Sequence, residues 1–203
     1  MSSADISRRF NQNLSRVENL IEMYDREGQG RRGAHEADVL RAAIVLLHAA
    51  LEDFLRSHLV DNIGGFDPET LDSYGFPSDH KRRQDKITLG QLAKHGRISI
   101  KRFVQQTVQE RIERYETFND AGDINGALRK CGFNTELIEG HDLSLLAEMI
   151  TRRHQIVHKA DRNENVGGRG NHRIASISVG VVNRYLESVR EFKEIVDQIV
   201  EEA

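Results

Sequence analysis

Cysteine, proline and tryptophan are nearly missing from this chain of 203 residues, which has one cysteine, two prolines and no tryptophan. A single cysteine, Cys131, excludes a disulfide framework and a zinc finger built on cysteine ligands. The chain also lacks a hydrophobic run of the roughly 20 residues that a membrane span needs. Its first residues, "MSSADISRRF", contain no apolar signal segment. These absences predict a cytoplasmic protein with no membrane contact.

The charge of the chain is close to balanced, with 29 lysines and arginines against 32 acidic residues and a net charge of -3. Bulk electrostatics would therefore not hold the molecule on a nucleic acid, and RNA binding would need a local basic patch. Two stretches are candidates for contacts to an RNA backbone. They supply Lys81, Arg82 and Arg83 in one run, and Arg169 and Arg173 within "GGRGNHR". The glycine-rich stretch lacks the spacing of a phosphate-binding loop, which argues against a nucleotide hydrolase.

Apolar residues recur at steps of three and four along most of the chain, which predicts an all-α protein. We expect an up-and-down helical bundle of five to six helices in a single domain over residues 1–203. The most apolar helix, over residues 36–62, is expected at the centre. Both prolines fall in residues 61–87, which reads as a surface insertion.

The helix that starts near Asp142 contains the stretch "RRHQIVHKAD", residues 152–161, in which two arginines and two histidines interrupt an apolar pattern. The inward face of this helix is predicted to carry Leu146, Met149, Ile150 and Val157.

His154 and His158 lie one helical turn apart, as in the metal-binding pair of a metalloprotease. That motif needs a glutamate after the first histidine, where this chain has Gln155, and nothing in the spacing supplies a third ligand. A metal site is therefore disfavoured, and no cofactor is predicted. A second pair on the same helix is Arg153 and His158, about 140° apart around the axis with ~7.5 Å of rise between them.

The stretch "RHQIVH" has an arginine, then a polar residue, and a histidine after three further positions, and this pattern resembles the motif of the HEPN superfamily. The stretch "RAAIVLLHAALEDFLRSHL" is similar to the apolar second helix, with its acidic residue, that HEPN domains pack beside the motif helix. The order of "INGALRKCGF", the motif helix and a long final helix resembles HEPN domains of prokaryotic conflict and toxin systems. The resemblance covers residues 36–200.

This resemblance implies an all-helical bundle that often forms a homodimer and, in many members, cleaves RNA without metal. Arg153 and His158 would then be the catalytic pair, with the histidine as base and the arginine stabilising negative charge on the phosphoryl oxygens. The expected function is a metal-independent endoribonuclease of toxin or defence type acting on single-stranded RNA. An antitoxin protein would be a further partner of such a toxin. The alternative is a non-catalytic HEPN module that binds RNA or a protein.

Two residues of the motif stretch have open roles. His154, in the polar position, is expected either to orient the phosphate or His158 or to lie idle on the helix surface. Arg152 is expected either as a second phosphate contact or as a solvated side chain. Arg153 and His158 could themselves be structural, because charged groups at helix ends often only satisfy the terminus.

Two carboxylates could support the motif. His48 and Glu52, one turn apart on the same helix, are expected either to pair with each other or to reach the motif helix. Glu52 is favoured as a buried acceptor that orients Arg153, because an unpaired buried carboxylate would be costly. Asp161 is expected either to begin the loop that follows the helix or to hold His158 in its productive tautomer.

Overall fold

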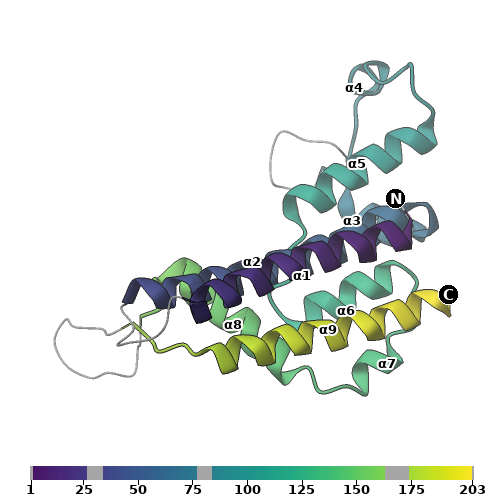
Figure 1. Ribbon diagram of the computed structural model, residues 1–203. Helices are drawn as coiled ribbons and strands as arrows, with labels where there is room; N and C mark the ends of the chain where they lie inside the picture. The colour runs from purple at the N-terminus through teal and green to yellow at the C-terminus, as the bar shows by residue number, and fades with distance from the viewer. Residues whose placement is uncertain (1, 27–33, 77–83, 163–173, 203) are drawn as a thin grey trace.

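The computed structural model describes residues 2–26, 34–76, 84–162 and 174–202, and this part of the chain is almost entirely helical (Figure 1). The helices are α1 (Ser3–Arg26), α2 (Ala34–Asn62), α3 (Pro68–Tyr74), α4 (Leu89–Ala93), α5 (Ile100–Tyr115), α6 (Ala121–Lys130), α7 (Glu136–Glu139), α8 (Ser144–Lys159) and α9 (Val179–Glu201), with a 3-10 turn, η1, at Ile63–Gly65. The prediction of an all-α bundle is confirmed. The described ranges hold nine α-helices rather than five to six, and the short helices α3, α4 and α7 account for the difference.

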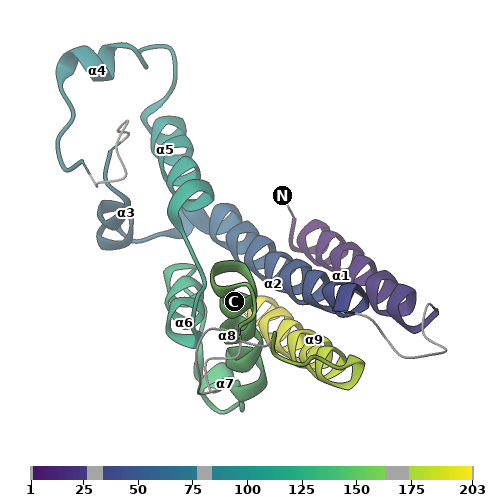
Figure 2. The same ribbon diagram turned by 90° about the vertical axis from the view of Figure 1, so that its left-hand side faces the viewer.

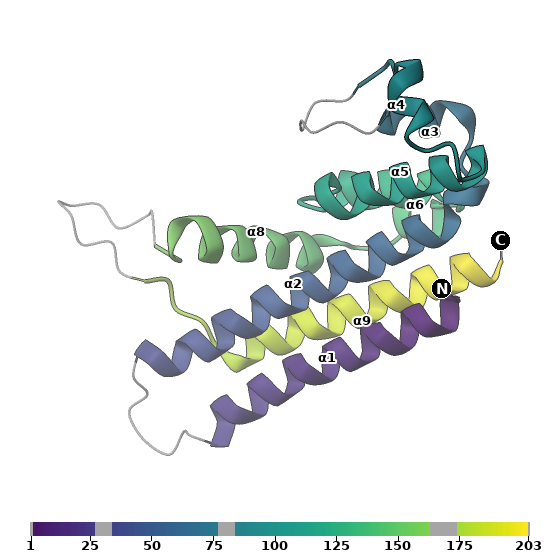
Figure 3. The same ribbon diagram turned by 90° about the horizontal axis from the view of Figure 1, so that it is seen from above.

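Helix α2 lies at the centre of the bundle, as predicted, and packs against α1, α5, α6, α8 and α9 (Figures 1 and 3). It is apolar around most of its circumference, so it must be covered on several sides. Its buried apolar side chains are Leu40, Ala43, Ile44, Leu47, Ala50, Leu51, Phe54, Leu55 and Leu59.

The apolar stripes of α1 and α9 are buried as their spacing predicts. Helix α8 buries Leu146, Met149 and Ile150, but Val157 is 47% exposed, so the expectation that Val157 faces inward is wrong. The inward face of the last turns runs instead through Arg153, whose Nε is buried, and Ile156, which packs against the core.

Helices α3, α4 and α5 project from one side of the bundle (Figure 2). Within the expected insertion, α2 continues to Asn62 and α3 begins at Pro68, where a missing backbone N–H costs nothing. The Asp67 side chain caps α3 by accepting a hydrogen bond from the Thr70 N–H at 2.8 Å. The organisation of residues 1–203 as one domain stays a prediction. In the described ranges, none of the helices is long and apolar enough to cross a membrane.

One histidine of α2 is part of the core. The His58 side chain is buried against Phe54, with ring centroids 4.6 Å apart and the planes nearly perpendicular, and against Phe133 at 6.2 Å. Burial disfavours the charged imidazolium and lowers the pKa of His58 to about 4. The native protein therefore holds this histidine neutral at pH values where an unfolded chain would protonate it.

This difference in pKa predicts an acid-sensitive fold. Between pH 6.5 and pH 4 the unfolded chain binds a proton at His58 that the native state does not, so stability falls as pH falls through this window. We expect the free energy of unfolding in urea to lose about 2 kcal/mol from this group between pH 7 and pH 5. His58→Gln should reduce the pH dependence by about that amount, and His141→Gln, at an exposed site, should not. Parallel stability curves for wild type and His58→Gln would contradict the prediction.

Candidate functional site

Arg153 and His158 lie on different sides of α8. The Arg153 side chain is half-buried on the side of α2, and its positive charge acts on His48 of that helix. The His158 side chain is exposed. This agrees with an offset of about 140° between the two positions on an ideal helix. One chain therefore presents the guanidinium toward α2 and the imidazole toward solvent.

His154 lies beside His158, as the spacing predicts. The two rings have centroids 4.5 Å apart and an angle of 45° between their planes, and both side chains are exposed. Within the described ranges, no group of three histidine, cysteine or carboxylate side chains is placed to hold a metal ion. The exposed side of α8 presents two neighbouring imidazoles.

Asp161 is the centre of a buried ionic cluster at the end of α8. Its carboxylate is 2% exposed, and its Oδ2 accepts hydrogen bonds from Arg41 Nε at 2.7 Å and Arg152 Nη2 at 2.9 Å. Both arginines also donate to the Ala175 carbonyl. Asp161 does begin the loop after α8, but it binds two arginines instead of His158. Arg152 is held in this cluster instead of being solvated or free for a phosphate.

The same cluster stabilises an unfavourable backbone. Ala160 and Asp161 have φ values of 50° and 55°, in the left-handed region that L side chains rarely adopt. The Asp161 N–H caps the helix by donating to the Gln155 carbonyl at 3.1 Å, and the Ala175 N–H donates to the Asp161 carbonyl at 2.8 Å. Such strain persists where the surroundings over-determine the conformation, and the ionic cluster does so here.

Glu52 pairs with its own helix. Its carboxylate lies 4.0 Å from His48 Nδ1 and 3.5 Å from Arg56 Nη2, where a hydrogen bond to Arg153 was expected. Burial is the main cause that lowers the pKa of His48, Glu52 opposes this shift, and the charge of Arg153 adds to it. Arg153 thus lies within the electrostatic reach of this pair. Its Nε is buried and has no hydrogen-bond partner among the described residues.

Arg41 is a residue of the site that no sequence motif identifies, whereas His48 is expected there as a partner of Glu52 or of the motif helix. The signal for both is their place in the sequence: each interrupts the apolar run of α2 at an inward position, where a polar side chain needs a partner. The predicted RNA-binding residues Lys81, Arg82, Arg83, Arg169 and Arg173 lie outside the described residues.

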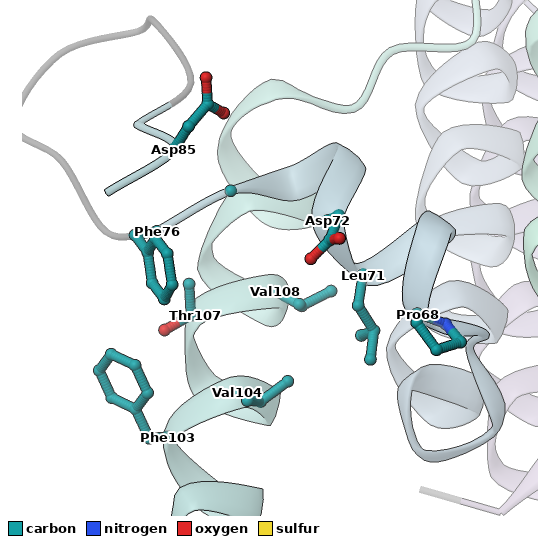
Figure 4. A pocket seen from close by; sticks show the side chains of 10 residues that line it. Pro68, Leu71, Asp72, Phe76, Asp85, Phe103, Val104, Thr107 and Val108 are labelled. Atoms are coloured by element: carbon teal, nitrogen blue, oxygen red, sulfur yellow. The ribbon is translucent and has the colours of Figure 1, made fainter. Parts of the chain in front are cut away.

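The described surface has cavities near α5 and near α8. One, of about 430 Å³, lies between α3 and α5, and Figure 4 shows Leu71, Phe76, Phe103 and Val108 around it. The described part of its lining is mostly apolar, with Asp72 and Asp85 as the charged residues. The other, of about 260 Å³, lies between α8 and α9 beside the motif.

An all-helical bundle whose polar motif helix packs beside a buried second helix with an acidic residue is the architecture of a HEPN domain. Residues 11–202 match the family model described as RiboL-PSP-HEPN, and the chain belongs to this family. Comparisons with curated proteins and with solved structures gave no match.

The ionic cluster predicts a large effect of a small substitution. Asp161→Asn keeps a residue that tolerates the left-handed conformation but removes the charge that pairs with Arg41 and Arg152. Breaking a buried ion pair on one side costs about 3–5 kcal/mol, and we expect that loss in the free energy of unfolding in urea. Asp72→Asn, at an exposed position, should change it by less than about 0.5 kcal/mol. A loss below about 1 kcal/mol for Asp161→Asn would show that the cluster is not needed.

Proposed function

We propose that this protein is a metal-independent endoribonuclease that cleaves single-stranded RNA, with Arg153 and His158 as its catalytic residues. The observation that carries the proposal is an exposed pair of imidazoles on the helix that also holds a guanidinium with an unpartnered buried donor. Membership of the RiboL-PSP-HEPN family supports it, because HEPN domains are often ribonucleases.

The proposed reaction is an attack of the ribose on its own phosphate. His158 takes the proton of the 2'-hydroxyl, the 2'-oxygen bonds to phosphorus, and the bond from phosphorus to the 5'-oxygen breaks. The 5'-oxygen leaves with a proton from an imidazolium, so the products are a 2',3'-cyclic phosphate and a 5'-hydroxyl. The Arg153 guanidinium stabilises the negative charge that gathers on the phosphoryl oxygens.

A homodimer supplies what one chain lacks. One His158 cannot readily act as base on one side of the phosphorus and as acid on the other, and within one chain Arg153 faces away from it. A two-fold dimer that brings two copies of α8 together presents two imidazoles to one phosphate. We therefore include dimerisation in the proposed mechanism.

Glu52 and His48 are proposed as positioning residues for Arg153. The Glu52 carboxylate, 14% exposed, and the Arg153 guanidinium both act on His48, so the two opposite charges lie near one imidazole. The charge of Glu52 offsets the cost of keeping Arg153 half-buried and leaves its Nε free to donate. The role is electrostatic and differs from the direct hydrogen bond expected from the sequence.

RNA outside the catalytic centre needs basic contacts. Lys81, Arg82, Arg83, Arg169 and Arg173 remain proposed for this role. The described residues add four exposed cations around α4 and the start of α5, namely Lys94, Arg97, Lys101 and Arg102. A toxin or defence role in the cytoplasm, with an antitoxin as partner, completes the proposal.

A second candidate function is a non-catalytic HEPN module that binds RNA or a protein. The observation that favours it is the inward orientation of Arg153, away from the exposed face that carries His158. Such a module would bind its partner without cutting RNA.

A cleavage assay tests the nuclease. We expect the purified protein to cut single-stranded RNA in EDTA and to leave 2',3'-cyclic phosphate ends. His158→Ala and Arg153→Ala should each lower the rate about 100-fold or more, as loss of a catalytic base or of a charge-stabilising group does. His141→Ala and Arg114→Ala, both at exposed sites of other segments, are the matched controls. Binding of RNA without cleavage would support the second function instead.

Mixed dimers test the shared site. Wild type and His158→Ala, unfolded together and refolded at equal amounts, should pair at random, so that about a quarter of the dimers carry two wild-type chains. If each site needs both copies of His158, activity should fall to about a quarter of that of wild type alone. If each site is contained in one chain, activity should instead be about half of that of wild type alone. The latter result would refute the shared site without refuting the nuclease.

A further inference from the structure

The cavity between α8 and α9 lies next to the proposed catalytic centre. It has a volume of about 260 Å³. Three elements line it: α8 through Glu148, Thr151, Arg152 and Gln155, the segment before α9 through Ser176 and Ile177, and α9 through Val181 and Tyr185.

The mouth of this cavity shares a face of α8 with His158. Thr151, Gln155 and His158 are spaced i, i+4 and i+7, which places them within about 60° of one another around the helix. Gln155 and His158 are separated by ~4.5 Å along the axis. If His158 holds the phosphate of a nucleotide, the cavity therefore lies about one helical turn away from that phosphate, within reach of the base.

The cavity combines apolar walls with uncommitted polar groups. Ile177 and Val181 provide the apolar surface. The hydroxyls of Thr151 and Ser176 and the amide of Gln155 make no side-chain hydrogen bond to any described part of the chain. A few polar groups that converge on an apolar hollow are typical of a small-ligand site.

One wall of the cavity carries a negative charge. The Tyr185 hydroxyl donates a hydrogen bond of 2.6 Å to Glu148 Oε1, which fixes the carboxylate and leaves Oε2 without a partner among the described residues. Burial, the hydrogen bond and the charge of Glu148 raise the pKa of Tyr185, so its hydroxyl stays protonated as the donor. A carboxylate at this place repels a phosphate and accepts hydrogen bonds from an uncharged amino group.

We propose that this cavity receives a nucleobase next to the scissile phosphate and selects bases with an exocyclic amino group over uracil. The free oxygen of Glu148 accepts from the amino group, as carboxylates do from cytosine N4. The Gln155 amide and the Thr151 hydroxyl complete the contacts to the base edge, and Ile177 and Val181 cover the ring. This inference rests on the proposed function, since it deepens the specificity of that site.

Binding of defined RNAs tests the proposal. The His158→Ala protein, which leaves RNA uncut, is titrated with fluorescent octamers of cytidine and of uridine, two pyrimidines that differ at the amino group. We expect the cytidine octamer to bind about tenfold more tightly, within the range of a good base contact. Adding Glu148→Ala should bring the two affinities within about twofold.

Two further variants separate base reading from structure. Tyr185→Phe removes the hydrogen bond to Glu148 but keeps the carboxylate, so the preference for cytidine should persist. Glu191→Ala removes an exposed carboxylate of α9 that does not line the cavity, and it should also keep the preference.

Equal affinity for the two octamers, or a preference that survives Glu148→Ala, would overturn the proposal. The proposed nuclease activity is tested separately, by measuring RNA cleavage with the protein in which His158 is intact. Cleavage without base preference would refute the base pocket alone. Preference for cytidine without cleavage would refute the nuclease and leave the pocket standing.

Discussion

The burial of α2 is the constraint on which the rest of the structure depends. A helix enclosed by five others buries several of its polar side chains, and partners on other helices reduce the cost of that burial. Arg41 forms an ion pair with Asp161 at the end of α8. His48 and Glu52 form a second pair, and the charge of Arg153, in the third turn of α8, acts on His48. The polar exceptions of the central helix therefore fix where the motif helix lies, and with it the site.

The sequence was sufficient for the architecture because the apolar period of each long helix is a local property. The stripe of α9, from Val182 to Ile199, is buried as its spacing requires. The prediction for Val157 was wrong although its spacing from Ile150 and Met149 fits an inward face. In the last turns of α8, Arg153 and Ile156 occupy that face. Short helices such as α3 depend on packing against neighbours, which a period does not reveal.

For the candidate site, spacing predicted what lies within one helix and failed for what lies between helices. The contact of His154 with His158 follows from a step of four residues. The partners of Asp161 do not follow from spacing, because Arg41 is 120 residues away in the sequence and nothing local selects it over other arginines. Glu52 has its nearest partners, His48 and Arg56, at steps of four residues on its own helix, so spacing predicts its pairing with His48 as well.

The strained end of α8 also bears on the order in which the molecule is made. Helical turns form fast and locally, whereas a contact such as that of Arg41 with Asp161 closes a long loop and forms late. Domains fold from the N-terminus onward during synthesis, and the last turn of α8 takes its final shape only after the segment around Ala175 has left the ribosome.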